Sequence, residues 1–214
     1  MAITILSHSD SADGWITSQS TGSWALVRDA STGVADHNDH NQLYAIRSRK
    51  VASGRGTQWR VSRAFFAFDT SAITDIPISG TLTIVGFSSG TADIRVAAST
   101  HNTTLANANF NAITGWTSGD NAGNVRLYDT VETTTWSTSG RNNIILSQAA
   151  LFDIAKLDTF KLCLIEADYD LRDIEPGTGV DIYSGCYFAD DTSGTRDPYI
   201  TIHPDNSTFI GANF

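Results

Sequence analysis

The densest group of potentially reactive side chains in the sequence is acidic, in the stretch EADYDLRDIE at residues 166–175. Asp168, Asp170 and Asp173 supply carboxylate oxygens, which calcium prefers as ligands. Their spacing does not follow the EF-hand pattern. The stretch therefore indicates either a calcium site or an exposed acidic loop at a strand end, where the carboxylates pair with Arg172 or Arg63.

A second stretch, DHNDHN at residues 36–41, offers mixed oxygen and nitrogen ligands from its aspartates and histidines. Six consecutive loop residues rarely enclose one ion without a distant further ligand, so we expect a solvated loop there. The sequence also lacks the His-Glu-x-x-His, P-loop and strand-linked Gly-x-Gly-x-x-Gly signatures. We therefore expect a protein that is not an enzyme and uses no cofactor, with calcium as the candidate ion.

Basic side chains are concentrated in RSRKVASGRGTQWRVSR, residues 47–63, which contains no acidic residue. A hairpin that turns at SGRG would place several of them on one face, as a positive patch on an acidic protein. Arginine pairs well with planar carboxylates at protein interfaces, whereas ordinary edge charges serve to discourage edge-to-edge strand pairing. Of these interpretations we favour partner docking, by Arg47, Arg49, Lys50, Arg55 and Arg60.

The C-terminal residues 205–214 include the apolar segment TFIGANF. Phe209, Ile210 and Phe214 have no obvious partner within the chain, and an exposed apolar segment usually marks a contact surface. We expect this tail to dock on a partner, and we expect residues 1–204 to form a single domain.

Two tryptophans, Trp116 and Trp136, lie in surroundings rich in Gly, Ser and Thr, and we expect them to be exposed. Aromatic rings on a β-rich fold can stack against sugar faces, which makes this pair a candidate carbohydrate platform. Packing in the core or at a sheet edge is the other interpretation.

The elements that must position these residues are almost all strands. Runs of Val, Ile, Phe, Tyr and Trp alternate with Gly-, Ser-, Asn- and Asp-rich turns, and helical periodicity is nearly absent. One short helix is predicted after Ser147, a favourable N-cap residue, because Leu151, Ile154 and Leu157 fall near one face. The predicted strands are residues 24–28, 43–51, 57–68, 79–87, 92–98, 124–129, 141–146, 159–166, 179–188 and 199–203.

The strand at residues 57–68 is apolar on both faces. Alternation places Ala64 and Phe66 on one face and Phe65 on the other, together with Arg63. Such a strand is central, packed against the sheet core on one side and against loops or a partner on the other. Arg63 then needs a carboxylate or backbone carbonyls close to it.

Composition limits the remaining possibilities. The chain of 214 residues is 41% hydrophobic, enough for one sizeable domain, and no apolar run approaches the roughly 20 residues of a membrane-spanning helix. Its net charge of −9 argues against a protein that coats nucleic acid. The N-terminus lacks the basic region of a secretory signal. Cys163 and Cys186 lie in apolar, strand-like surroundings, either as free thiols or as a disulfide between adjacent strands.

Several segments, taken together, resemble one known family. SRAFFAFDTSAI at residues 62–73 resembles the Arg-x-x-x-x-Phe-Asp-Thr-Ser pattern of DNRLRE-type jelly-roll modules, which occur in secreted bacterial proteins and phage virion proteins. ISGTLTIVGF at residues 78–87 resembles the strand that follows it in that family. Further similarity lies at residues 13–33, 140–173 and 187–203.

The departures from the family pattern are Ala67, where the family often carries a polar residue, and the tail at residues 205–214. The resemblance implies an all-β fold, an antiparallel two-sheet jelly-roll β-sandwich with one short helix and no catalytic centre. Free-standing modules of this group are typical of phage particles. The resemblance thus implies a virion structural protein that decorates or cements a capsid.

Its expected partners are the major capsid protein or other virion proteins, and it is expected to form a homo-oligomer, with a trimer favoured. The alternative is a carbohydrate-binding host-recognition module of a tail fibre or appendage. Neither interpretation involves nucleic acid or a membrane.

Overall fold

The computed structural model describes residues 4–7, 12–36, 41–54, 56–119, 123–190 and 194–204. The helical segments are α1 (Trp24–Arg28), the 3₁₀ turn η2 (Asn107–Asn109), α2 (Gln148–Lys156) and the π-helical turn η3 (Ala167–Leu171). The strands are β1 (Thr4–Ser7), β2 (Gly14–Ser20), β3 (Val34–Asp36), β4 (Asn41–Ser53), β5 (Gly56–Asp69), β6 (Ser79–Ser89), β7 (Ile94–Ala98), β8 (Arg141–Ile145), β9 (Thr159–Glu166), β10 (Val180–Tyr187) and β11 (Tyr199–His203).

The described strands join into one large antiparallel sheet that does not close on itself. Its main path runs β1-β11-β6-β10-β4-β5-β2-β3, while β8 pairs with β6, and β9 pairs with both β5 and β7. The long strand β5 changes neighbours along one edge, from β4 over residues 56–62 to β9 over residues 64–69. The sequence prediction of an antiparallel, mostly β fold is therefore confirmed.

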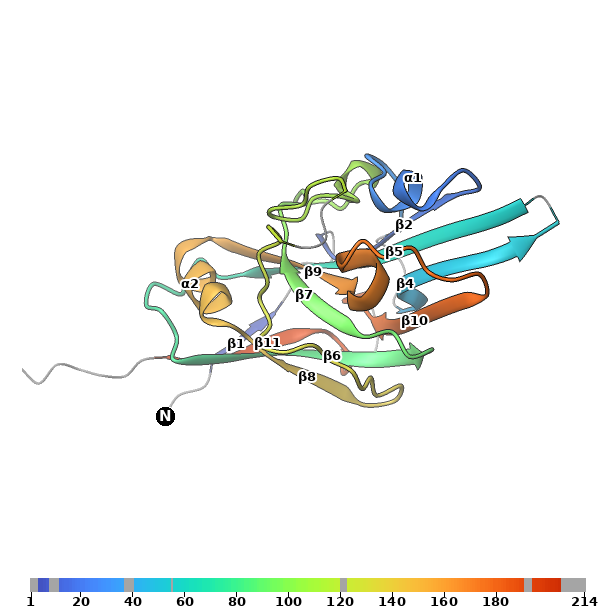
Figure 1. Cartoon of the computed structure of the whole chain (residues 1–214). Coiled ribbons are helices and arrows are strands. Elements are labelled where there is room, and N and C mark those ends of the chain that lie inside the picture. Colours follow the sequence, from blue (N-terminus) through green and yellow to red (C-terminus); the bar gives the residue numbers. More distant parts are fainter. Residues whose placement is uncertain are drawn as a thin grey trace, which may run out of the picture.

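The main hydrophobic core lies between two groups of strands. In Figure 1, β1, β11, β6 and β8 lie below β9, β5, β4 and β2. Phe66 and Phe68 of β5 pack in one cluster with Leu82 of β6 and Ile200 of β11. The ring of Phe66 stacks on that of Phe188 at 5.3 Å between centroids. This cluster joins strands that are distant in the sequence.

A second hydrophobic cluster covers the opposite face of β5 and β9. It contains Phe65 of β5 and Ile165 of β9, covered by Trp24 of α1 and by Phe110 in the segment after η2. Both faces of β5 are therefore buried, one by the main core and the other by α1 and loops. The predicted two-sided burial of this strand is confirmed.

Most predicted strands are present within one or two residues, and α2 begins as predicted. The Ser147 hydroxyl oxygen accepts a hydrogen bond from the backbone N–H of Ala150, which is N-cap geometry. Two predicted strands were wrong. Residues 24–28 form α1, capped by Ser23, and residues 124–129 contribute only isolated bridges, at Leu127 and Asp129.

Both cysteines are buried free thiols in strands β9 and β10. Burial raises the pKa of each thiol well above its usual value, because the charged thiolate is disfavoured away from water. Cys163 and Cys186 therefore behave as small apolar core residues, and the alternative of a disulfide between them is wrong.

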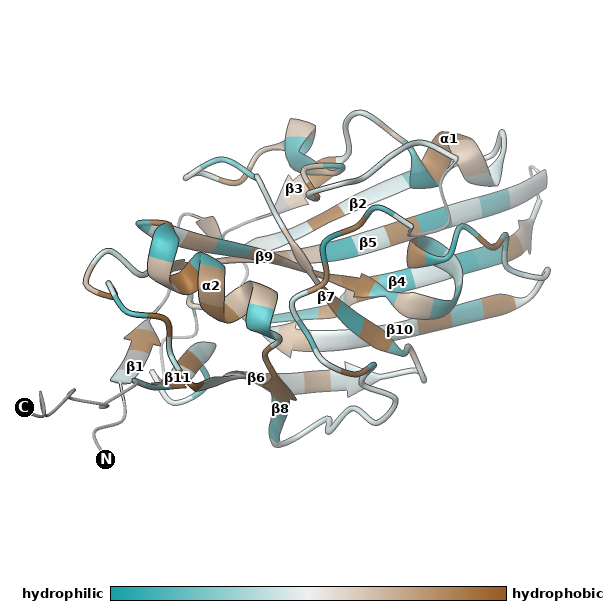
Figure 2. Ribbon diagram, turned by 60° about the vertical axis from the view of Figure 1, so that its left-hand side comes forward, coloured by the Kyte–Doolittle hydropathy of each residue, from teal (hydrophilic) through white to brown (hydrophobic). Residues whose placement is uncertain are grey.

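The hairpin of β4 and β5 projects from one end of the sheet. The two strands pair from Ser53 opposite Gly56 to Arg47 opposite Ser62. Figure 2 shows that hydrophilic residues are concentrated on the outer ends of these strands, whereas the inner part of the sheet is hydrophobic. This polar end of the sheet carries most of the arginines singled out in the sequence.

Candidate ligand-binding face on the arginine-bearing hairpin

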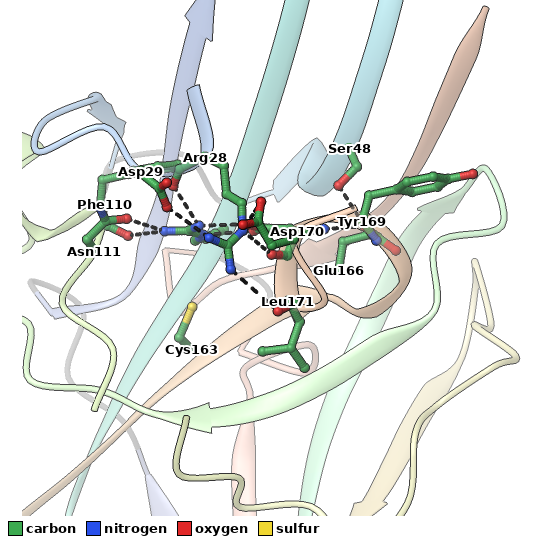
Figure 3. A network of polar contacts seen from close by, with 12 residues as sticks. Arg28, Asp29, Ser48, Phe110, Asn111, Cys163, Glu166, Tyr169, Asp170 and Leu171 are labelled. Atoms are coloured by element: carbon green, nitrogen blue, oxygen red, sulfur yellow. Dashed lines mark hydrogen bonds and ion pairs between the residues drawn. The ribbon is translucent and has the colours of Figure 1, made fainter. Parts of the chain in front are cut away.

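Arg63 is fully buried and uses every N–H of its guanidinium group. Its Nε and Nη2 donate to the two carboxylate oxygens of Asp170 at 2.8 and 2.6 Å. Its Nη1 donates to Phe110 O at 2.8 Å and Asn111 Oδ1 at 2.6 Å, and Nη2 also donates to Arg28 O at 3.0 Å. Figure 3 shows Asp170 on one side of this network and Phe110 and Asn111 on the other. The sequence prediction that Arg63 needs a carboxylate or carbonyls is confirmed, and the structure supplies both.

Trp116 belongs to the same network and is half-buried. Its ring centroid lies 4.1 Å from the guanidinium carbon of Arg63 and 4.2 Å from that of Arg28. Trp136 is only 9% exposed, and its Nε1 donates to Gly185 O at 2.9 Å. The expectation that these two tryptophans form an exposed pair was therefore wrong, because one stacks on arginines and the other packs in the core.

The three predicted calcium ligands do not converge. Asp170 is fully engaged by Arg63, whereas Asp173 accepts from Trp24 Nε1 at 3.2 Å. Asp168 forms an ion pair with Arg172. Each carboxylate thus has a different partner, and the structure does not bring the three together.

Asp168 instead approaches two acids that the sequence analysis did not select. Carboxylate oxygens of Asp93, Glu132 and Asp168 all lie within 4.8 Å of one another. Arg172 supplies a cation to the group, since its guanidinium contacts both Glu132, at 2.7 Å, and Asp168. Burial and the Asp168 charge raise the pKa of Asp93. The three acids come from separate segments, and no local spacing signals their meeting.

Glu166, at the end of β9, is buried and organises the turn that presents Asp170. Its carboxylate accepts hydrogen bonds from Ser48 Oγ and from the backbone N–H groups of Asp168, Tyr169 and Asp170. Burial raises its pKa to about 7, although these four donors oppose that shift. Glu166 thus fixes η3 in the position that completes the Arg63 network.

Strand register divides the basic residues of the hairpin between its two faces. Arg47 and Arg49 share one face with Arg60, which lies directly opposite Arg49. Lys50 lies on the other face, where its Nζ donates to Glu175 at 2.7 Å. Three of the predicted residues, Arg47, Arg49 and Arg60, thus share one face, here named the arginine face, and Lys50 does not. Arg55 and the tail residues Phe209, Ile210 and Phe214 lie outside the described residues.

Arg47 is the rigid member of the arginine face. Its guanidinium donates to both carboxylate oxygens of Asp181, at 2.8 and 2.7 Å. It also lies 3.9 Å from the ring centroid of Tyr44, which packs edge-on against Tyr183. Arg49 contacts the same Asp181 carboxylate at 3.4 Å. One carboxylate therefore serves two arginines.

Beside the arginines lies a cavity of about 420 Å³. Its walls include Trp15, Gln19, Tyr44 and Arg60. Trp15 Nε1 and Arg60 Nε are buried and have no hydrogen-bond acceptor among the residues that the structure describes. A buried polar group left unsatisfied costs about 1–3 kcal/mol. Each of these two donors thus lacks a partner within the described part of the chain. Arg60 could be selected from the sequence, whereas the part of Trp15 and Tyr44 in this cavity depends on the strand pairing.

One sequence pattern associated with hydrolases is present but does not form that site. Gly-Phe-Ser-Ser-Gly at residues 86–90 matches the Gly-x-Ser-x-Gly nucleophile elbow, which requires a sharp strand-to-helix turn. Here Ser88 lies within strand β6, and its hydroxyl donates to Leu43 O at 2.6 Å. The pattern is therefore part of a strand.

Comparisons with known proteins find no matching family model and no matching curated protein. The resemblance to DNRLRE-type modules therefore stays a sequence-based prediction. Among the described helices, none has the length and apolar character needed to cross a bilayer.

Proposed function

We propose that this chain is a non-catalytic structural protein of a phage or virus particle that decorates its capsid. The observation that carries the proposal is the arginine face, on which Arg49 and Arg60 lie opposite one another beside a cavity, with Asp181 already paired. Like charges placed directly opposite on a sheet are destabilising, so an acidic partner surface would relieve them. Its proposed partner is the major capsid protein or another virion protein.

The composition of the arginine face supports an interface. Arginine, tyrosine and tryptophan are the side chains most enriched at protein interfaces and their energetic centres. Arg47 is only 3% exposed and is held by Asp181 and Tyr44, so it supports the surface on which Arg49 and Arg60 are partly exposed. The protein as a whole is acidic, with a net charge of −9, so a negative partner would be steered towards this face and away from the rest of the surface.

We further propose that the strands of this sheet form the two packed layers of a jelly-roll sandwich. The shared core of β5, β9, β6 and β11 supports this interpretation. A homo-oligomer, with a trimer favoured, and docking of residues 205–214 on a partner complete the proposal. It includes no role for nucleic acid, a membrane or a cofactor.

The proposal is tested by sedimentation of the purified protein with particles stripped of it. The double variant Arg49→Glu/Arg60→Glu should lose particle binding while remaining folded, because both side chains lie at the partly exposed surface. Arg141→Glu, on an exposed position of β8, is the matched control. Failure of the wild-type protein to bind any particle would exclude capsid decoration.

Carbohydrate binding is a second candidate, supported by the same cavity. Trp15 and Tyr44 offer aromatic surface beside the amide of Gln19, a combination suited to sugar rings. Glycan-array binding that is lost in Tyr44→Ala would favour a host-recognition module. A silent array for the folded wild-type protein would count against it.

A further inference from the structure

Two of the side chains that line the cavity beside the arginine face carry an N–H donor that has no acceptor among the described residues. Trp15 Nε1 and Arg60 Nε are both buried without an acceptor, and both side chains line the same cavity. The Nη2 of Arg60 donates to the neutral amide oxygen of Gln19. What the described part of the cavity lacks is an acceptor that carries negative charge.

The electrostatics of Arg60 point in the same direction. Arg60 lies in register with Arg49 and close to Arg47, and Asp181 is engaged by both of those arginines. Burial, followed by the charges of Arg47 and Arg49, lowers the pKa of Arg60. An incoming carboxylate would offset this repulsion, and it matches the planar fork of a guanidinium group.

The surroundings of the cavity favour a side chain of a protein as the source of the carboxylate. Tyr44 and Trp15 provide flat apolar walls against which the methylene groups of an acidic side chain can pack. The adjoining surface continues over Arg49 of β4 and Tyr183 of the next strand, β10, wider than one small ligand would cover. We infer that the cavity receives a glutamate or aspartate side chain of an acidic partner protein, an inference that rests on the proposed function.

The probe for this inference is N-acetyl-glutamate amide, followed by the indole N–H resonance of Trp15 in a ¹⁵N NMR titration. The resonance is assigned by its loss in Trp15→Phe. We expect a saturable shift with this probe and little or none with N-acetyl-glutamine amide, which has the same shape without the charge. Arg60→Gln should weaken binding by about tenfold or more, because a charge-assisted hydrogen bond is lost. Arg141→Gln should leave it unchanged.

Three outcomes would overturn the inference. Equal shifts of the Trp15 resonance with N-acetyl-glutamate amide and N-acetyl-glutamine amide would show that the cavity does not recognise the negative charge. A response to glucuronate without one to N-acetyl-glutamate amide would assign the cavity to an acidic sugar. Unchanged affinity in Arg60→Gln would place the binding elsewhere.

Particle binding separates this inference from the proposed function. If the wild-type protein binds N-acetyl-glutamate amide but no particle, the capsid assignment fails and the carboxylate site stands. If particles bind the wild-type protein and Arg60→Gln equally well, the capsid assignment stands, but the cavity does not receive an acidic side chain of the partner.

Discussion

Arg63 connects several parts of the chain through one guanidinium group. It lies on β5 and contacts η3 through Asp170, the last residue of α1 through Arg28 O, and the segment after η2 through Phe110 O. These segments contribute few regular backbone ladders of their own. The network therefore determines how the loops cover the second face of the sheet.

Replacing Arg63 by methionine should lower the free energy of unfolding by about 3–5 kcal/mol, because it leaves the Asp170 carboxylate buried without its cation. Urea denaturation measures the change. Arg172→Met is the control, since its ion pairs lie at the surface and are worth less than about 1 kcal/mol each. Similar losses in the two variants would show that the buried pair is not special.

His101 makes stability depend on pH. Its Nε2 lies 2.9 Å from Ala12 O and its Nδ1 lies 2.8 Å from Ser99 Oγ, and it is fully buried. Burial, together with the positive charge of Lys161, lowers its pKa from 6.5 to about 4. At a pH between about 4 and 6.5, His101 is therefore neutral in the folded protein but protonated in the unfolded chain.

The stability contributed by neutral His101 should be complete above pH 6.5 and should be lost as the pH falls towards about 4. The shift corresponds to about 3 kcal/mol over that window. Urea unfolding at several pH values, compared with the same series for His101→Asn, isolates this contribution. Parallel pH profiles for the two proteins would contradict the prediction. Glu166, whose pKa is also shifted, contributes equally to the pH dependence of both proteins, so its contribution cancels in the comparison.

At the scale of single elements, α2 offers a direct test of capping. Ser147→Ala removes the hydroxyl that accepts from Ala150 N and should cost about 0.5–2 kcal/mol. Thermal or urea unfolding measures the loss. Ser31→Ala, at an exposed position after α1, serves as control and should change stability by less than about 0.5 kcal/mol. An equal loss of stability in Ser147→Ala and Ser31→Ala would show that the cap does not stabilise the protein.

Elements with a strong local pattern could be predicted from the sequence, and short or irregular ones could not. Strand β5 has alternation over its whole length, and α2 has both a cap and a repeating apolar face. By contrast, WALVR at residues 24–28 is too short for its period to be read, and Ser23 decides the helix by capping Leu26 N. Tertiary packing of Trp24 then stabilises α1.

The same distinction applies to the candidate site. The need of Arg63 for a buried carboxylate follows from its place in an apolar strand, so it was predictable. The group of Asp93, Glu132 and Asp168, and the cavity beside Arg60, depend on which segments the sheet brings together. Trp15 and Arg60 line one cavity because β2 pairs with β5, and neither residue's neighbours in the sequence signal that pairing.

At the scale of the whole molecule, charge is distributed unevenly. The chain is acidic overall, yet the open end of the sheet carries Arg47, Arg49 and Arg60 on one face, with Asp181 as their described counter-charge. An uneven distribution of this kind orients a molecule as it approaches a charged surface. The apolar core on the inner part of the same face fixes the strands that carry it.

Binding to particles should therefore weaken as salt is added. Raising NaCl from about 0.05 M to about 0.5 M shortens the screening length several-fold, so attraction between the arginine face and an acidic partner should decline, with affinity falling by about tenfold or more. Sedimentation with particles across a salt series measures this. Arg141→Glu should keep the wild-type salt dependence, whereas Arg49→Glu/Arg60→Glu should bind weakly at every salt concentration. Tight, salt-independent binding of the wild-type protein would assign the contact to an apolar surface instead.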